Sequence, residues 1–385
     1  MIRKIRMGMV GGGRDAFIGA VHRMAAGLDG LIELVCGAFS SDPERSRLSG
    51  SDLFLPAERC YGSYAELFAV EKTLPEAEKM DFVSIVTPNH LHYPVAKEAL
   101  ENGFHVMCDK PMTFDLVEAR RLATLVESTG LVFGLTHNYT GYPLVKEARV
   151  RIARGDLGRI RKIVVEYPQG WLATAIETDD QKQASWRTDP ARAGISCCMG
   201  DIGTHAENLA EYVTGLRIES LCADLSTFVP GRALDDDGNV LLRFAGGARG
   251  ILHVSQISID EENDLRIRVY GEKGGLDWRQ EEPNTLLLKW PDRPREIVRA
   301  SGPTLSDIAA ANTRLPMGHP EGFIEAFANL YRNFAHTVDA HARGELPSAQ
   351  HLDFPNVEDG VRGMAFIETV VASSQSDEKW TPFPD

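Results

Sequence analysis

The sequence predicts an α/β fold in two parts: a doubly wound parallel sheet, followed by an α/β domain with an open, mostly antiparallel sheet. Two observations predict it. In roughly the first 135 residues, short β-branched runs alternate with helical patterns, which is typical of βαβ units around a parallel sheet. Later strands are longer and are separated by glycine-containing turns, as in hairpins. We therefore expect domains at residues 1–137 and 138–385.

Five short apolar runs are the expected strands of the parallel sheet. They are Ile5–Val10, Ile32–Phe39, Phe82–Thr87, His105–Cys108 and Val132–Thr136. The segments between them have helical patterns. In Asp115–Glu127 the apolar residues recur with a helical period, and Asp115 with Glu118 resembles a capping box.

The second part is expected to mix strands with a few long helices. The expected strands are Asn239–Phe244, Gly250–Ile259, Leu265–Tyr270 and Leu286–Trp290, with turns at Gly246-Gly247 and Gly274-Gly275. The expected helices are Pro143–Arg154, Asp201–Thr214, Glu321–Ala342 and Val357–Ser374. The stretch Ser301–Leu315 is expected to be a long loop, which in a compact enzyme is often functional.

Composition narrows the class of protein. The 385 residues are 43% hydrophobic and 25% charged, as in an ordinary globular protein. The net charge of −14 argues against a nucleic-acid backbone as the main partner. No apolar run approaches the ~20 residues that cross a bilayer. The basic start Met1–Arg6 lacks a signal peptide's apolar core. Six cysteines in strand-like and interior contexts suggest a reduced, cytoplasmic protein.

No metal site is expected. The cysteines and histidines lack the spacing of a zinc site. The acidic run Asp235-Asp236-Asp237-Gly238 lacks the alternating ligands of an EF-hand. An Asp-Gly pair before a strand is instead expected to form a turn.

A glycine-rich loop follows the first expected strand. Gly11-Gly12-Gly13-Arg14-Asp15-Ala16 fits the pattern G-x-G-x-x-A and opens a helix. Gly11 would permit the tight turn, Gly13 a close approach to a pyrophosphate, and Ala16 helix–strand packing. The helix N-terminus would supply amides to phosphates, with Arg14, Phe17 and Ile18 beside them. The alternative is a loop that only turns, but its context favours a dinucleotide, NAD or NADP.

The end of the second strand bears on the choice of cofactor. An acidic residue there would bind the ribose hydroxyls of NAD, but that position holds Ser40. Ser40, Ser41 and Arg45 can instead bind a 2′-phosphate. In the alternative, Asp42-Pro43-Glu44 is only a helix N-terminus. The sequence leans slightly to NADP.

Two further loops follow strands of the parallel sheet. Thr87-Pro88-Asn89-His90-Leu91-His92 and Cys108-Asp109-Lys110-Pro111 each lie at the carboxyl end of a strand, where open α/β sheets bind ligands. In the alternative, Lys110 is an ordinary solvated lysine and the histidines lie at a helix start near solvent. We expect Thr87, Pro88, Asn89, His92, Asp109, Lys110 and Asn138 to contact the cofactor.

These motifs resemble those of the Gfo/Idh/MocA family of NAD(P)-dependent sugar and cyclitol oxidoreductases. The motifs are Val10-Gly11-Gly12-Gly13 with Gly19, Thr87-Pro88-Asn89-x-x-His92, Asp109-Lys110-Pro111, Asp201-x-x-x-His205 and Asp359-Gly360-Val361-Arg362-Gly363. The third usually reads Glu-Lys-Pro, so Asp109 is a conservative departure. The resemblance implies a Rossmann domain, then an α/β domain with an open antiparallel sheet, and a Lys–Pro peptide, often cis, beside the nicotinamide.

The resemblance also implies the catalytic residues. Asp201, His205 and Asn208 have the spacing i, i+4 and i+7, which on a helix puts them on one face. A secondary alcohol would give a hydride to C4 of the nicotinamide. His205, whose residue type titrates nearest neutrality, would be the general base. Lys110 would stabilise the developing alkoxide, and Asp201 would orient substrate or base. In the alternative, Asp201 is a helix cap and His205 a buried structural histidine.

Aromatic and polar residues elsewhere suit a sugar substrate. Tyr139 follows the last strand of the parallel sheet. Trp171 lies in Tyr167–Trp171 and Arg187 in Trp186–Pro190. We expect these three to bind substrate together with Lys110, Asp201 and His205. The alternative for the tryptophans is packing.

The resemblance leaves other functions open. A minority of relatives are glycosidases that use NAD through transient oxidation. A protein of this fold can also be a cofactor sensor that has lost its chemistry. The resemblance further implies a homodimer or homotetramer formed through the exposed face of the second sheet, since such a face must be polar or covered.

Overall fold

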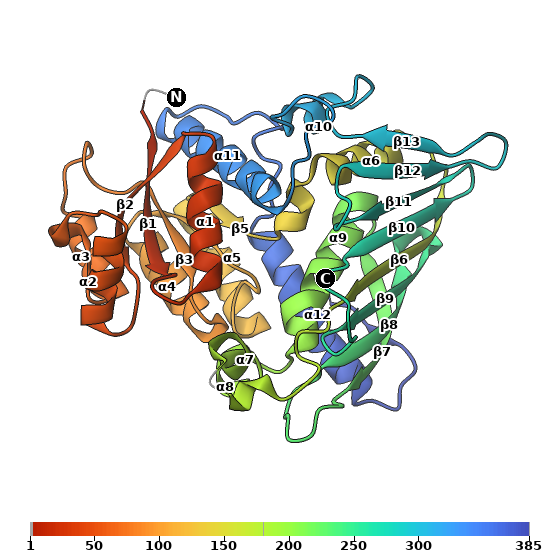
Figure 1. Ribbon diagram of the computed structural model, residues 1–385, viewed down its shortest axis with the longest axis horizontal. Helices are drawn as coiled ribbons and strands as arrows, with labels where there is room; N and C mark the ends of the chain where they lie inside the picture. The colour runs from red at the N-terminus through yellow and green to blue at the C-terminus, as the bar shows by residue number, and fades with distance from the viewer. Residues whose placement is uncertain (1–2, 180, 385) are drawn as a thin grey trace. The chain divides into compact units, whose positions relative to one another are not determined.

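The computed structural model describes residues 3–179 and 181–384, and its chain forms two compact units (Figure 1). The first unit contains the chain up to Asn138 together with Phe327–Val361. The second contains Tyr139–Ala326 and the chain from Arg362. The chain therefore returns to the first unit after completing most of the second.

The first unit contains a five-stranded parallel sheet in the order β2-β1-β3-β4-β5. The strands are β1 (Ile5–Gly11), β2 (Ile32–Ala38), β3 (Phe82–Val86), β4 (His105–Cys108) and β5 (Phe133–Leu135). This order makes the sheet doubly wound, with the chain reversing direction across it between β1 and β3. All five expected strands are confirmed, most with ends shifted by a residue or so.

Helices connect these strands. They are α1 (Phe17–Leu28), α2 (Pro43–Asp52), α3 (Tyr64–Glu71), α4 (His92–Glu101) and α5 (Leu116–Thr129), with short 3₁₀ turns η1 (Ala57–Arg59) and η2 (Asn89–Leu91). The expected capping box is present on α5. Asp115 accepts a hydrogen bond from the Glu118 amide, and the Glu118 carboxylate accepts one from the Phe114 amide. Gly130 ends α5 with a φ of +66°.

The core of the first unit includes residues from late in the chain. Every residue of β3 is buried, as expected for a parallel strand covered on both faces. Helix α11 (Phe323–Ala342) supplies Phe334, whose ring centroid lies 5.1 Å from that of Phe82. The hydroxyl of Tyr331, on the same helix, forms a hydrogen bond of 2.8 Å with the hydroxyl of Ser84 on β3. The part of α11 from Phe327 onward thus belongs to the first unit, and its middle turns are part of the core around the parallel sheet.

The second unit is built on a nine-stranded sheet in the order β13-β12-β11-β10-β6-β9-β8-β7-β14. The strands are β6 (Ile160–Pro168), β7 (Ile218–Ser226), β8 (Asp237–Phe244), β9 (Arg249–Ser255), β10 (Arg266–Gly271), β11 (Gly275–Arg279), β12 (Thr285–Lys289), β13 (Glu296–Arg299) and β14 (Thr381–Pro382). All neighbouring pairs are antiparallel except β6 with β9. The mostly antiparallel sheet is therefore confirmed.

Helices of the second unit lie on one face of this sheet (Figure 1). Helices α6 (Pro143–Ala153) and α9 (Thr204–Thr214) contact its strands, and α12 (Val357–Ser374) follows late in the chain. Strand β8 shows the resulting alternation, because Val240 and Leu242 are buried while Leu241 between them is exposed. The short helices α7 (Lys182–Arg187) and α8 (Pro190–Ala193) precede α9.

Several local expectations are wrong. The segment Ser301–Leu315 is not all loop, because it contains α10 (Asp307–Ala311). The strand expected to reach Ile259 ends at Ser255, which pairs with Asp237, the first residue of β8. The acidic run before Asn239 is not a turn: Asp237 and Gly238 begin β8, paired with β7 and β9. Gly275 opens an unexpected strand, β11.

The helix expected from Asp201 also differs. Residues Met199–Gly203 form a π-helical turn, and the α-helix α9 begins only at Thr204. The spacing of Asp201, His205 and Asn208 is therefore not that of one regular α-helical face. π-turns widen a helix locally and are frequent at functional sites. In the described part of the chain, no helix is long and apolar enough to cross a membrane.

Candidate active site

The glycine loop of the first unit is tightly packed. Gly11 and Gly12 have φ values of +85° and +70°, which favour glycine. A Cβ on Gly19 would lie 2.3 Å from the Cα of Gly12, so α1 can approach the loop only without a side chain at that position. The sequence assigned this packing role to Ala16. The structure instead has Ala16 as the half-buried residue that precedes α1.

Gly13 is constrained by the close approach of other parts of the chain and not by its φ angle. A Cβ there would lie 2.7 Å from both the Phe39 carbonyl oxygen and the Ser49 hydroxyl. Glycine at this position therefore lets the loop pack against the end of β2 and the last turn of α2. Its amide also lies 3.3 Å from the Phe39 carbonyl as a hydrogen-bond donor.

A hollow of about 470 Å³ adjoins this loop. It is lined by Gly12–Phe17, by Ala20 and Arg23 of α1, and by Ser49, Asp52 and Leu53 at the end of α2. Arg23 donates to the Gly12 carbonyl at 2.7 Å, and Arg14 pairs with Asp52 at 2.6 Å. Phe17 is 68% exposed, and Ile18 is half-buried. The hollow therefore combines a helix N-terminus with paired charges.

Ser40, Ser41 and Arg45, which are expected to bind the 2′-phosphate of the ribose, lie at the start of α2, where Arg45 forms an ion pair. Asp42 caps α2 by accepting from the Arg45 amide at 2.8 Å, and the Ser40 hydroxyl accepts from the Asp42 amide. The Arg45 guanidinium donates to Asp15 at 2.5 Å and to the Arg14 carbonyl at 3.1 Å. Ser41 is exposed. The positive charge of Arg45 is therefore already paired.

The loops after β3 and β4 are tied together by a buried histidine. His92 is 1% exposed, and its two ring nitrogens lie 2.8 Å from the Thr87 carbonyl and 2.7 Å from the Pro111 carbonyl. Burial lowers the pKa of His92, although Asp109 and the two carbonyls oppose that shift. The Lys110–Pro111 peptide is cis, as the resemblance implies. The position of His92 makes it a link between the two loops.

Asp109 is held from several sides. One of its carboxylate oxygens accepts from the Thr136 hydroxyl at 2.7 Å and from the Lys110 amide at 2.9 Å. The Nε2 atom of His22 lies 3.9 Å from the same oxygen. Burial raises the pKa of Asp109, but His22, Lys110 and Thr136 outweigh burial and lower it below its ordinary value. Asp109 therefore fixes the backbone from which Lys110 projects.

Buried polar atoms at this edge of the sheet suit a polar ligand. Thr87 Oγ1, His90 Nδ1 and Asn138 Nδ2 are buried, with no hydrogen-bond partner among the described residues. Pro88 and the buried Asn89 lie between the first two. Buried polar groups in native proteins are nearly always satisfied. A dinucleotide along the carboxyl edge of the sheet would satisfy them, so the residues present fit such a cofactor.

Asp201 and His205 lie on the π-turn and the first turn of α9, in the second unit. One carboxylate oxygen of Asp201, Oδ2, accepts from Arg187 Nε at 3.1 Å and from Gln256 Nε2 at 2.9 Å. His205 is 7% exposed, and its ring packs edge-on against that of Tyr139, with centroids 4.8 Å apart. Both side chains are thus positioned by neighbours from distant parts of the chain.

A hydrogen-bonded chain extends from this histidine. The hydroxyls of Tyr139 and Tyr167 are bonded to each other, and Tyr167 donates to Asn263 at 2.7 Å. Gln169 also donates to Asn263, and the Trp171 indole donates to Gln169 at 3.1 Å. Burial raises the pKa of both tyrosines. The chain orients the polar ends of aromatic residues beside His205.

The structure gathers five expected site residues in the second unit: Tyr139, Trp171, Arg187, Asp201 and His205. Lys110 and the expected cofactor residues belong to the first unit. Sequence reasoning missed Gln256, Asn263 and Asp235. Gln256 and Asn263 lie in the loop between β9 and β10, and Asp235 lies in the loop before β8. A single polar residue in a loop belongs to no sequence motif, so only the fold identifies these three. Among the described residues, no cluster of three or more histidine, cysteine or acidic side chains is arranged to hold a metal.

Comparison with known proteins gives consistent matches over most of the chain. Residues 5–137 match a family model described as an oxidoreductase family with an NAD-binding Rossmann fold. Residues 145–277 match the GFO/IDH/MocA C-terminal domain. Together the two matches span more than half of the sequence.

Individual relatives align end to end. The uncharacterised oxidoreductase YfiI of Bacillus subtilis is 35% identical, over 99% of this chain and 97% of that one. Levoglucosan dehydrogenase of Pseudarthrobacter phenanthrenivorans is 27% identical, over 100% and 99%.

A solved structure has the same fold. The inositol dehydrogenase homologue of Azotobacter vinelandii in complex with NAD⁺ superimposes with a TM-score of 0.95, at 36% identity, over 100% of this chain and 98% of that one. The same homologue with NADH and myo-inositol gives 0.92, over the same shares of each chain. The chain therefore belongs to the Gfo/Idh/MocA family of NAD-binding oxidoreductases.

Proposed function

We propose that this protein is a dehydrogenase or reductase that transfers a hydride between a nicotinamide cofactor and a secondary hydroxyl or keto group of a sugar, a sugar derivative or a cyclitol. The observation that carries the proposal is the pair at the junction of the π-turn and α9: His205 on the first turn of α9 follows a carboxylate on the π-turn, Asp201, that is held by two hydrogen-bond donors. Two relatives support the substrate class. One is named levoglucosan dehydrogenase, and the other was solved with NADH and myo-inositol.

The cofactor would be held by the first unit. The amides at the start of α1 and the loop Gly11–Gly13 would bind its phosphates, because a helix N-terminus favours anions. The unsatisfied Thr87, His90 and Asn138 would bind polar groups along the sheet edge. When bound, the nicotinamide supplies the hydride acceptor or donor, which the protein itself lacks.

We expect NAD(H) to be preferred over NADP(H). The sequence leans to NADP because Ser40, Ser41 and Arg45 can bind a 2′-phosphate. However, Arg45 is paired with Asp15, whose negative charge would repel that phosphate. The NAD⁺ and NADH complexes of the Azotobacter homologue support the same choice.

The protein's contribution is to position the substrate and to move one proton. In the oxidation direction, His205 accepts the proton of the reacting hydroxyl at a ring nitrogen. Lys110 donates a hydrogen bond to the same oxygen and stabilises its developing negative charge. Asp201 accepts a hydrogen bond from the substrate or from His205 and thereby orients it. The indole of Trp171 and the ring of Tyr139 offer apolar faces to the C–H bonds of the sugar ring, and Arg187 a donor to its hydroxyls.

Turnover assays test this function directly. Purified protein would be incubated with NAD⁺ or NADP⁺ and a panel of sugars and cyclitols that includes myo-inositol and levoglucosan. Appearance of reduced-nicotinamide absorbance with one of them, lost on His205→Asn substitution, is the expected result. Cleavage of a glycoside without net change in absorbance would favour the glycosidase alternative. No reaction of either kind in a protein that binds the cofactor would favour a sensor.

We further propose a homo-oligomer formed through the exposed face of the nine-stranded sheet. Leu241 of β8 and Ile251 of β9 are register partners on that face and are 46% and 36% exposed. Val164 of β6 pairs with Ile251 and continues the apolar row. Light scattering that gives twice or four times the chain mass would support this assembly, and a monomer mass would refute it.

A further inference from the structure

We propose that Gln256 and Arg187 are positioning residues that hold Asp201 as an ionised, acceptor-only carboxylate, so that the reacting proton goes to His205 and not to Asp201. The inference rests on the proposed function, because it states which residue of that site accepts the proton and which residues hold Asp201. It also assigns Arg187, which the sequence suggests as a substrate ligand, a role toward Asp201.

The donor set on Asp201 is the first argument. Oδ2 accepts from the Arg187 guanidinium at 3.1 Å and from the Gln256 amide at 2.9 Å. A carboxylate oxygen has two lone pairs, so two donors use its accepting capacity. A proton on Oδ2 would displace one of them. The positive guanidinium favours the charged carboxylate whichever oxygen would take the proton.

The orientation of Gln256 is the second argument. Its side chain is fully buried, and its backbone amide and carbonyl are both bonded, to the Asp236 carbonyl and the Leu172 amide. The Cys197 thiol donates to Gln256 Oε1 at 3.4 Å, which leaves Nε2 facing Asp201. A buried amide oriented this way acts as a fixed donor to Asp201.

Arg187 is fixed independently. Its Nη1 atom donates to the Gln183 side chain at 2.8 Å and to the Gln183 carbonyl at 3.2 Å. Its guanidinium carbon lies 4.3 Å from the centre of the Trp186 ring and 5.8 Å from that of Trp171. These contacts hold the guanidinium plane, so that Nε rather than a mobile terminus meets Asp201.

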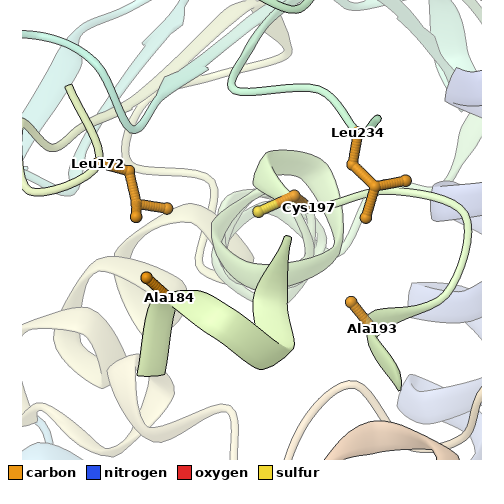
Figure 2. Close-up of a cluster of buried hydrophobic side chains, with 5 residues drawn as sticks. All are labelled: Leu172, Ala184, Ala193, Cys197 and Leu234. Atoms are coloured by element: carbon orange, nitrogen blue, oxygen red, sulfur yellow. The ribbon is translucent and has the colours of Figure 1, made fainter. Parts of the chain in front are cut away.

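A small buried cluster seats α7 and α8 beside the π-turn. Figure 2 shows Ala184 of α7, Ala193 of α8 and Cys197 just before the π-turn, with Leu172 and Leu234 on either side. Four of the five residues are at most 7% exposed, and Ala193 is 9% exposed. Their small side chains on the helices allow close packing, which sets where Arg187 emerges.

The start of the turn is held by a second carboxylate. Asp235 accepts from the Ser196 hydroxyl at 3.0 Å and from the amides of Cys197 and Met199 at 3.0 and 2.9 Å. These amides precede the helix and lack helical partners, so Asp235 caps the turn from a distant loop. The backbone that carries Asp201 is thus fixed from one side and its carboxylate from the other.

Other charged and titratable groups also surround Asp201, and they bear on any pH effect. Cys197 interacts electrostatically with Asp201, Asp235, Arg187 and Arg232. Tyr139 and Tyr167 interact electrostatically with Asp201 as well. Burial raises the pKa of Cys197 and of both tyrosines, so these three groups stay neutral near neutral pH.

The test exchanges the Gln256 donor for an acceptor of the same shape. In Gln256→Glu the new carboxylate faces Asp201, and like charges there disfavour ionisation of both. At low pH one proton shared by the two carboxyl groups restores a hydrogen bond between them. At high pH that proton dissociates and the hydrogen bond is lost. We expect kcat/KM with the best substrate of the panel to fall about 100-fold at pH 8 and to recover at least tenfold toward pH 6, relative to wild type.

Two further variants separate positioning from packing. Gln256→Met keeps the volume but removes the donor, and we expect a fall of about tenfold in kcat/KM with no recovery at low pH. Gln280→Glu introduces the same change in charge at a half-buried glutamine elsewhere in the second unit and is expected to keep the wild-type profile. A wild-type pH profile in Gln256→Glu, or an unchanged kcat/KM in Gln256→Met, would overturn the inference.

An activity-independent measurement distinguishes failure of the inference from failure of the proposed function. The melting temperature of Gln256→Glu, relative to wild type, should fall as pH rises from 6 to 8, whereas that of Gln280→Glu should not. This result stands even if wild-type protein oxidises no polyol. NADH affinity should be equal in wild type and Gln256→Glu, because the cofactor residues belong to the first unit. A melting-temperature difference independent of pH would refute the paired carboxylates.

Discussion

Gly12 and Gly19 are in direct backbone contact: a Cβ on Gly19 would lie 2.3 Å from the Gly12 Cα and 2.6 Å from its carbonyl oxygen. The start of α1 therefore reaches the loop that follows β1 only because neither residue has a side chain. The carbonyl of Gly12 also accepts a hydrogen bond from Arg23, one turn further along the helix. The geometry of the nucleotide loop thus depends on a glycine in the helix as well as on those in the loop.

Substituting Gly19 by alanine should displace the helix from the loop. We expect Gly19→Ala to weaken NADH binding at least tenfold, since the helix N-terminus would no longer face the phosphates, and to lower the melting temperature. The matched control is Gly27→Ala on the same helix, where a Cβ meets no atom within 4 Å. It should be neutral or stabilising by up to about 1 kcal/mol. Equal effects of the two variants would contradict this role for Gly19.

The predicted role of Lys110 is tested by removing its ammonium group. Lys110→Ala should reduce kcat by about 10²–10⁴, the contribution of one acid–base or electrostatic group. Lys97→Ala is the control, because Lys97 is a lysine of the same unit whose side chain is 44% exposed and paired with Glu101 on α4. Turnover close to wild type in Lys110→Ala, with a substrate that wild type oxidises, would remove Lys110 from the catalytic assignment.

Cofactor preference should depend on the Arg45–Asp15 pair. Asp15→Asn removes the carboxylate that neutralises Arg45, and asparagine tolerates the φ of +64° at this position. The ratio of NADPH to NADH affinity should then rise at least fivefold, and adding Arg45→Ala should cancel that gain. Titrations of the three proteins with both nucleotides measure it. An unchanged ratio in Asp15→Asn would show that Arg45 does not read the 2′ position.

Stability should fall in mild acid partly because of His105. Its Nδ1 atom accepts from the Val132 amide at 2.9 Å, so the native state needs the neutral ring. Burial, and secondarily His341, lowers the pKa of His105 to about 4. In the unfolded chain a histidine titrates near 6.5. The unfolded state therefore binds a proton that the native state does not as pH falls from about 6.5 to about 4.

The His105 contribution can be isolated by substitution. As pH falls from about 6.5 to about 4, the shifted titration of His105 should lower the free energy of unfolding of wild type by about 3 kcal/mol. Denaturant unfolding of wild type and His105→Gln, at several pH values between 7 and 4, measures the difference. The two curves should converge as pH falls, because only wild type loses this term. Parallel curves would show that His105 does not titrate in this way.

Much of the fold could be predicted from local patterns. Five β-branched runs separated by amphipathic segments specify a parallel sheet, and Asp115 with Glu118 specifies a helix start that the structure confirms. The return of Phe327–Val361 to the first unit has no comparable signal in the sequence. An apolar helix face predicts burial but not which sheet buries it, so the packing of Phe334 on Phe82 follows only from the fold.

The candidate site likewise contains residues that the sequence predicts and residues that only the fold identifies. Lys110, Asp201 and His205 lie in motifs of recognisable order, whereas Gln256 and Asn263 act through contacts with residues 55 and 96 positions away. Helical periodicity does not distinguish the π-turn at Met199–Gly203 from an α-helix, so the sequence predicts a regular helix there. The acidic run before Asn239 predicts a turn, but in the structure Asp235 caps the π-turn.

The most direct test of the central claim is a fluorescence titration of nucleotide-free protein with NADH and with NADPH. Removal of bound nucleotide must first be verified by absorbance. We predict saturable binding of both or of NADH alone, with NADH the tighter ligand, and weaker binding of NADH to Gly19→Ala than to Gly27→Ala. Failure of verified nucleotide-free protein to bind either reduced cofactor would contradict the assignment of this chain as a nicotinamide-dependent dehydrogenase.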